Sequence, residues 1–152
     1  MKKLQIGLEL SIRRCKEEDA CFVHDLMKNQ MKEYFESISE GWSEERYWRG
    51  YAPERITIIE HEKKPVGFFD YEIRNDELYM HNLQLISEYH RKGIGREVIS
   101  YVKKIACNAN IHQIIGKVFK TNKESCNLSK RAGCTIQKDL VEENSYLVRL
   151  EV

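Results

Sequence analysis

Two glycines, Gly93 and Gly95, follow a short basic stretch and open an apolar helical pattern, an arrangement that could bind phosphate oxygens. The first turn of a helix leaves backbone N–H groups without partners and carries the positive end of the helix dipole. The stretch RKGIGR (residues 91–96) lacks the third glycine of a dinucleotide-binding motif and the Gly-Lys-Ser/Thr end of a P-loop. We therefore exclude both nucleotide motifs and expect another anion-binding turn, with a plain, basic, solvated turn as the alternative.

This turn must be positioned by the elements on either side of it. An apolar strand is predicted over residues 78–86, and a helix with one apolar stripe starts at Ile94. The next strand is predicted over residues 114–119. Because a helix separates the two strands, we expect them to be parallel through a right-handed crossover.

The rest of the chain alternates between strand and helix patterns. A capping box at Thr121-x-x-Glu124 opens a helix that ends near Gly133. The other predicted strands cover residues 8–13, 55–61, 66–73, 134–138 and 145–151, and the other predicted helices run from 17 toward 30 and over 44–51.

Composition limits the function classes. The 152 residues are most simply one domain, and 25 basic against 24 acidic residues give a net charge of +1, with no global field for nucleic acid or an anionic membrane. The five cysteines are odd in number without a C-x-x-C motif, so we expect reduced, mostly buried thiols and no zinc site. No apolar run has the length of a membrane span, and we expect a cytoplasmic location.

Two motifs and the element order resemble the GNAT acetyltransferase superfamily. Residues 90–95, HRKGIG, resemble its Gln/Arg-x-x-Gly-x-Gly/Ala pyrophosphate loop, with His90 replacing the usual Gln or Arg. Residues 122–134 resemble its Asn-x-x-Ala-x-x-Leu-Tyr-x-x-x-Gly-Phe element, with Ser129 at the tyrosine position. The resemblance implies a single domain over residues 1–152 with an α/β fold: a mixed, mostly antiparallel sheet with a parallel central strand pair, flanked by helices.

The resemblance also implies acetyl-CoA as the co-substrate and no metal. Main-chain amides of residues 91–96 would bind the pyrophosphate, and the pantetheine arm would lie between the two parallel strands. A backbone N–H near Leu83 would stabilise the oxyanion. The implied cofactor-binding residues are Leu83, Gln84, Leu85, His90, Arg91, Lys92, Gly93, Ile94, Gly95, Arg96 and Asn122.

Acetyl transfer to an amine also needs a proton acceptor, since an alkylamine with a pKa of about 10 is protonated near pH 7. Strand alternation is expected to place Tyr79, His81, Leu83 and Leu85 on one face. Residues 81–85 resemble the His-x-Leu-x-Val strand of arylalkylamine acetyltransferases, in which the histidine helps to remove the proton. A histidine hydrogen-bonded in the sheet without catalytic duty is the alternative. The implied catalytic residues are Tyr79, His81, Leu83 and Ser129, the last standing where many relatives have a tyrosine that protonates the leaving thiolate.

Two groups of residues are candidates for binding the acceptor. Asp70 and Glu72 share a face of the neighbouring predicted strand and could bind a cationic amine, although a solvated strand face is the more common role. Tyr34 and Phe35, together with nearby tryptophans, fall in the region where the family usually forms its acceptor pocket. Core packing is the alternative for these aromatic residues.

The sequence therefore predicts an N-acetyltransferase that transfers the acetyl group of acetyl-CoA to a primary amine by direct attack. A small-molecule acceptor is slightly preferred, because no broad charged docking groove is evident. The alternative is a non-catalytic acyl-CoA-binding or regulatory module that kept the loop and lost the acid at Ser129. We expect a monomer or homodimer with no nucleic acid or membrane partner.

Overall fold

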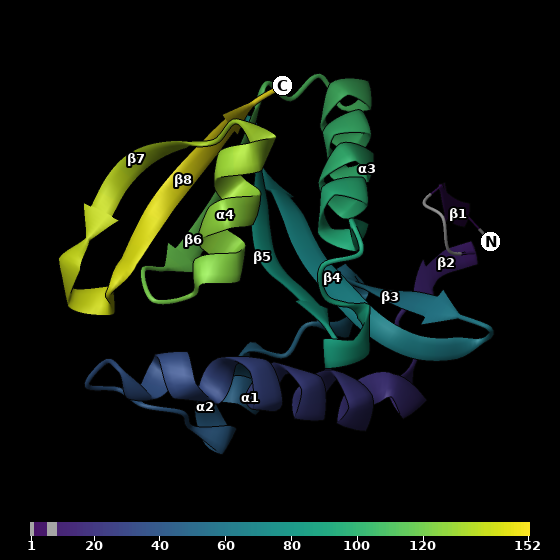
Figure 1. The fold of residues 1–152 in the computed structure, drawn as a ribbon, viewed down its shortest axis with the longest axis horizontal. Helices are drawn as coiled ribbons and strands as arrows, with labels where there is room; N and C mark the ends of the chain where they lie inside the picture. Colours follow the sequence, from purple (N-terminus) through teal and green to yellow (C-terminus); the bar gives the residue numbers. More distant parts are fainter. Residues whose placement is uncertain (1, 6–8) are drawn as a thin grey trace.

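One mixed sheet organises the part of the chain that the computed structural model describes, residues 2–5 and 9–152. Its eight strands lie in the order β1-β2-β3-β4-β5-β6-β8-β7, and all neighbours are antiparallel except β5 and β6 (Figure 1). The strands are β1 (Lys2–Gln5), β2 (Glu9–Arg14), β3 (Ile56–His61), β4 (Lys64–Arg74), β5 (Glu77–Leu85), β6 (Gln113–Phe119), β7 (Thr135–Leu140) and β8 (Ser145–Glu151). The predicted mixed sheet with one parallel central pair is confirmed.

Within residues 2–5 and 9–152, four α-helices cover the two faces of the sheet. Helices α1 and α2 lie on one side, and α3 and α4 lie on the other (Figure 1). Their bounds are α1 (Ala20–Glu36), α2 (Glu44–Gly50), α3 (Ile94–Asn108) and α4 (Lys123–Ala132), and single 3-10 turns occur at Glu17–Asp19, Pro53–Arg55, Ser87–Tyr89 and Val141–Glu143.

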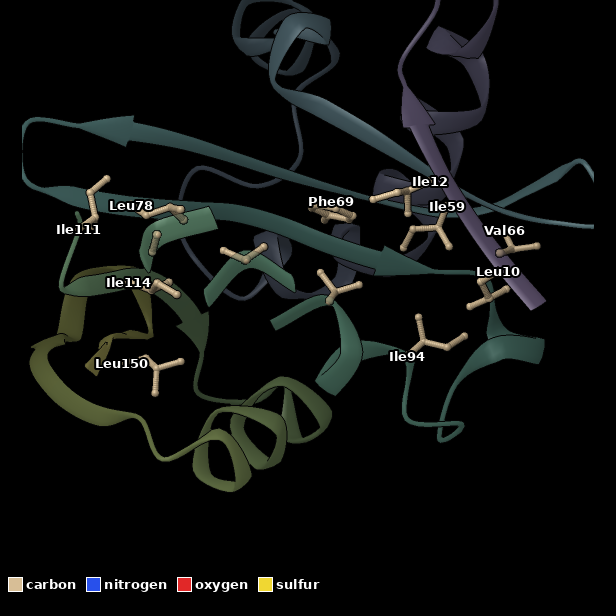
Figure 2. Packing of buried hydrophobic residues seen from close by; sticks show 13 residues of the cluster. Leu10, Ile12, Ile59, Val66, Phe69, Leu78, Ile94, Ile111, Ile114 and Leu150 are labelled. Carbon is tan, nitrogen blue, oxygen red and sulfur yellow. The ribbon is translucent and has the colours of Figure 1, made fainter. Parts of the chain in front are cut away.

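The larger hydrophobic cluster joins α3 to the sheet. Every fourth residue of the helix from Ile94 to Ala106 is buried against strand residues such as Phe69 and Leu78 (Figure 2). A second cluster lies between α1 and the other face, where Phe68 is buried with Val23 and Leu26. Full burial of such a side chain contributes about 1.5–3 kcal/mol, so packing on both faces fixes the positions of the central strands.

Several predicted element boundaries differ from the structure. Residue 8, where the first strand was expected to begin, lies outside the described residues, and β1 was not predicted. The first helix begins with a 3-10 turn at Glu17 and continues to Glu36, beyond the expected end near residue 30. Helix α2 begins as expected, since the Ser43 side chain accepts a hydrogen bond from the Arg46 N–H.

The predicted capping box at residues 121–124 is wrong by one residue. Asn122 is the N-cap of α4, and its Oδ1 accepts a hydrogen bond from the Ser125 N–H at 3.2 Å. Asparagine caps helices as well as threonine does, and the turn closed by Asn122 N–H and Phe119 O at 3.0 Å places it at the helix start.

The five cysteines are free, as expected, but the prediction that they are mostly buried is wrong. Cys21 and Cys107 are exposed, and the other three are half-buried. Both exposed cysteines lie on outward positions of amphipathic helices, which residue type alone does not reveal. Among the described helices, none combines the length and apolar character that a membrane crossing needs.

Candidate active site

The two parallel strands separate soon after they begin. They pair only at Leu78 with Ile114, Tyr79 with Ile115, and Met80 with Gly116, although both strands continue beyond these positions. A cleft of about 750 Å³ opens where they diverge, lined by the second half of β5, the start of α3, the end of β6 and α4. Backbone groups of β5 beyond Met80 therefore face an opening and could hydrogen-bond an extended ligand arm.

A glycine-containing turn closes one end of this cleft. Gly93 is the N-cap of α3 with φ +81°, a left-handed conformation that favours glycine. The first helical bond runs from Glu97 N–H to Gly93 O at 3.2 Å, so the amides of residues 94–96 precede the helical hydrogen bonding. A Cβ on Gly95 would lie 3.0 Å from Leu128 Cδ2, so a larger residue there would separate α3 from α4. The exposed Arg91, Lys92 and Arg96 add positive charge around these amides.

His90 holds this turn to both neighbouring elements. Its Nε2 donates a hydrogen bond to the Leu85 carbonyl oxygen at the end of β5, at 2.8 Å. Its Nδ1 lies 3.3 Å from a carboxylate oxygen of Glu124 in the first turn of α4. His90 therefore joins β5 to α4 beside the cleft that it lines.

A β-bulge interrupts β5 at His81. Asp70 of β4 pairs with Asn82, whereas the next residue, Tyr71, pairs with Met80. His81 is therefore an extra residue with no direct opposite in β4. A bulge of this kind reverses the alternation of side chains beyond it.

The bulge separates residues that were expected to share a face. Leu83 and Leu85 pack against the cluster beneath α3, while the rings of His81 and Tyr79 lie together with centroids 4.7 Å apart. His81 Nε2 lies 2.8 Å from Oε1 of Glu72, which is on β4. The prediction that Tyr79, His81, Leu83 and Leu85 point the same way is thus wrong, because strict alternation assumed an unbroken strand.

The acidic residues of β4 take part in an ionic network. Asp70, whose side chain is 7% exposed, accepts a hydrogen bond from Arg55 Nε at 3.1 Å, and Glu72 Oε1 lies 2.6 Å from an Arg74 nitrogen. The hydrogen bond from His81, followed by that from Arg74, holds the pKa of Glu72 below its usual value. A solvated strand face is therefore the wrong interpretation for Asp70, and both carboxylates already have cationic partners.

The aromatic residues near the first helices separate into two groups. Tyr34 lines the cleft, and its ring stacks on Phe119 at the end of β6 with centroids 5.8 Å apart. Burial, and secondarily the negative charge of nearby residues, raises the pKa of Tyr34. Phe35 and Trp42 instead pack against the cluster beneath α1, whereas Trp48 is 44% exposed.

Most of the predicted site residues line the cleft. They are Tyr34, His81, Leu83, Gln84, Leu85, His90, Arg91, Gly93, Ile94, Gly95, Arg96, Asn122 and Ser129. Five predicted site residues are not among the described residues that line the cleft: Phe35, Asp70, Glu72, Tyr79 and Lys92. The sequence reasoning missed Gln30 and Met31 of α1 and Asn82 of the bulge, which line it too. The helical spacing from Gln30 to Tyr34 could have indicated the α1 residues, since i and i+4 share a face.

Several solved acetyltransferases have the same fold as this chain. The PaiA N-acetyltransferase of Thermoplasma acidophilum, solved with coenzyme A, is 18% identical with a TM-score of 0.75, over 94% of this chain and 99% of that one. The spermidine N-acetyltransferase of Vibrio cholerae, solved with CoA and spermine, is 19% identical with a TM-score of 0.71, over 93% and 95%. Naa50 of Arabidopsis thaliana, solved with the bisubstrate analogue CoA-Ac-MVNAL, is 14% identical with a TM-score of 0.71, over 94% and 99%.

These likenesses show the fold, and a family model shows the family. The model of the acetyltransferase (GNAT) family matches residues 23–134, which include the diverging strands, the glycine-containing turn and α4. The chain therefore belongs to the GNAT acetyltransferase family.

Proposed function

We propose that this protein transfers the acetyl group of acetyl-CoA to a primary amine of an acceptor by direct attack. The observation that carries the proposal is the cleft between β5 and β6, with free amides at one end and His81 along its wall. Family membership and the CoA complexes of structurally similar proteins support the same chemistry.

The turn and the cleft would divide the binding of acetyl-CoA between them. The amides of residues 94–96, with Arg91 and Arg96 nearby, would bind the pyrophosphate oxygens. The pantetheine arm would extend along β5 past Leu85, where strand pairing with β6 has ended. A backbone N–H near Leu83 would then stabilise the oxyanion of the intermediate.

His81 would remove the proton from the acceptor ammonium. The amine lone pair then attacks the thioester carbonyl carbon, and collapse of the tetrahedral intermediate breaks the C–S bond. The nitrogen loses its second proton, which ends on the CoA sulfur, so the overall reaction gives an amide, CoA thiol and one proton released through His81. A thiol pKa of roughly 8.5 makes the thiolate an adequate leaving group even with Ser129 at the tyrosine position of many relatives.

The acceptor is proposed to be a small molecule. It would approach the acetyl group along α1, where Gln30, Met31 and Tyr34 line the cleft. The spermidine acetyltransferase with a similar fold was solved with a small polyamine, which supports an amine acceptor without identifying it. We further propose a cytoplasmic location, because five free cysteines suit a reducing compartment. The proposed assembly is a monomer or homodimer.

A second candidate is a non-catalytic acyl-CoA-binding or regulatory module. Ser129 favours it, because a serine cannot protonate the thiolate as a phenol would. Both candidates bind acetyl-CoA, so binding alone does not separate them.

The test measures binding and turnover on the same preparation. Calorimetry should show acetyl-CoA binding that is lost in Gly95→Leu, which would separate α3 from α4, and kept in Gly50→Ala, where an added Cβ meets nothing within 4 Å. CoA thiol release is then followed with a panel of small amines, amino acids, polyamines and peptides. Amine-dependent release supports the proposal. Tight binding with no release across the whole panel supports the module, and absence of binding overturns both.

A further inference from the structure

We propose that Glu72 is a positioning residue for His81: its carboxylate accepts a hydrogen bond from Nε2–H, so the lone pair that takes the proton of the acceptor is on Nδ1. The inference rests on the proposed acetyl transfer and deepens it. It also gives Glu72 a different role from the amine-binding one expected from its position on β4.

The two shortest contacts of the His81 ring decide which nitrogen carries the proton. Nε2 lies 2.8 Å from Oε1 of Glu72 and 3.5 Å from a guanidinium nitrogen of Arg74. A carboxylate only accepts hydrogen bonds, so a bare Nε2 at 2.8 Å would place two lone pairs against each other. The shorter contact therefore requires Nε2–H, and in a neutral imidazole the other nitrogen then carries the lone pair.

The surroundings hold the imidazole in this orientation. The Tyr79 ring lies against it with centroids 4.7 Å apart, and the Arg74 guanidinium covers the same Tyr79 ring at 4.5 Å from its centroid. The bulge frees His81 from a direct cross-strand neighbour, and His81 is among the residues that line the cleft. Within the part of the chain that the structure describes, the polar contacts of the ring all involve Nε2, and with Nε2 protonated the one with Glu72 is the hydrogen bond.

The charges around His81 balance before it takes a proton. Glu72 and Asp70 are opposed by Arg74 and Arg55, and Arg55 reaches both carboxylates, with 3.1 Å to Asp70 and 3.7 Å to Glu72. A proton arriving on Nδ1 would be stabilised by the Glu72 carboxylate and opposed by the Arg74 guanidinium. The two neighbours should therefore move the pH dependence of turnover in opposite directions.

Glu72 is also unsuited to bind a cationic amine directly. Its Oε1 accepts hydrogen bonds from Arg74 Nε at 2.7 Å and from His81 at 2.8 Å. An incoming ammonium would have to compete with a guanidinium that is already in place. The carboxylate thus acts on the reaction through the imidazole.

The first test reads the tautomer and needs no turnover. Long-range ¹H–¹⁵N NMR spectra of the labelled protein distinguish Nε2–H from Nδ1–H imidazole, and the His81 signals are assigned by their loss in His81→Gln. The wild type should show Nε2–H, and Glu72→Gln should shift the neutral ring toward Nδ1–H, because a carboxamide can donate to Nε2. Asp76→Asn, which makes the same charge change in the β4–β5 turn, should keep the wild-type tautomer.

The second test uses the acceptor found in the thiol-release assay. Glu72→Gln should lower kcat by about 10- to 100-fold without changing acetyl-CoA affinity. This is at or below the low end of the roughly 10²- to 10⁴-fold typical of general acid–base catalysis, because the variant keeps His81 itself. The acidic limb of the kcat/KM profile should move to lower pH in Glu72→Gln and to higher pH in Arg74→Gln. A purely structural role for Glu72 would lower stability without these opposite shifts.

The outcomes separate the two proposals. An Nδ1–H tautomer in the wild type, or an unchanged tautomer in Glu72→Gln with an unchanged pH profile, overturns the role of Glu72 even if acetyl transfer is found. The expected tautomers without any turnover would instead overturn the proposed function and leave only the orientation of His81 established.

Discussion

Gly67 of β4 offers a sharp test of whether the close spacing of β4 and β5 beside the cleft is needed for stability and cofactor binding. It lies opposite Leu85 of β5, and a Cβ at position 67 would be 2.6 Å from the Gln84 carbonyl oxygen and 2.6 Å from Leu85 Cδ2. The Leu85 side chain can rotate, but the carbonyl belongs to the backbone of β5. Ordinary van der Waals contact begins at 3.4 Å, so the distance from the added Cβ to the Gln84 carbonyl oxygen would have to increase by about 0.8 Å. That increase requires β5 to move away from β4.

Gly67→Ala should therefore lower both stability and cofactor affinity. Overpacking of this kind typically costs about 1–3 kcal/mol, and for a chain of this length each kcal/mol lowers Tm by about 2–4 °C. The displaced end of β5 also carries the Leu85 carbonyl that accepts the hydrogen bond of His90. We expect the Kd for acetyl-CoA to rise by about tenfold, equivalent to about 1.4 kcal/mol.

Thermal unfolding and calorimetric titration of the same samples measure the two effects. Gly50→Ala at the end of α2 is the matched control, since its added Cβ meets nothing within 4 Å. A Tm and an acetyl-CoA affinity for Gly67→Ala that match those of the control would refute the claim that β4 fixes the position of this end of β5.

Three further outcomes are expected. Asn122→Ala removes the N-cap that binds the Ser125 N–H and should cost about 1 kcal/mol, measured by urea unfolding; no change in the midpoint would mean that water replaces the cap. Ser129→Tyr should change turnover only modestly, and a complete loss of acetyl-CoA binding would contradict the alignment of α4 with the family element. Arg13 at 2.7 Å is the main cause that holds the pKa of Asp19 below its usual value, so the carboxylate contributes stability above its unfolded pKa of about 3.9. That contribution is lost as pH falls through the lower folded pKa. The difference in unfolding free energy between wild type and Asp19→Asn should therefore become smaller over this acidic range, measured by unfolding at a series of pH values. A difference that stays constant with pH would contradict this role of Asp19.

The turn and its flanking elements could be predicted because their signals are local. The glycines at 93 and 95 mark a tight turn, and the apolar stripe that starts at Ile94 fixes both the helix and the face that it buries. A helix between two apolar strands then implies the parallel pair. Each step depends on residues close together in the chain, so no knowledge of distant contacts was needed.

The predictions that were wrong or missing concern features that depend on contacts between residues far apart in the sequence. The bulge at His81 arises from the register of β5 against β4, and nothing in the order of residues 79–85 marks it. The burial of Asp70 depends on Arg55, which is 15 positions away and joins it only after folding. Strand β1, with the sequence KKLQ, has no alternating pattern and is defined by its pairing with β2.

The early separation of β5 and β6 divides the sheet into two halves. Strands β1 to β5 form one half and β6, β8 and β7 form the other, and three residue pairs join them. A ligand that fills the opening would contact both halves, so its binding energy depends on the angle between them. Substitutions in outer strands such as β2 or β7 that alter this angle should therefore change affinity without touching the ligand.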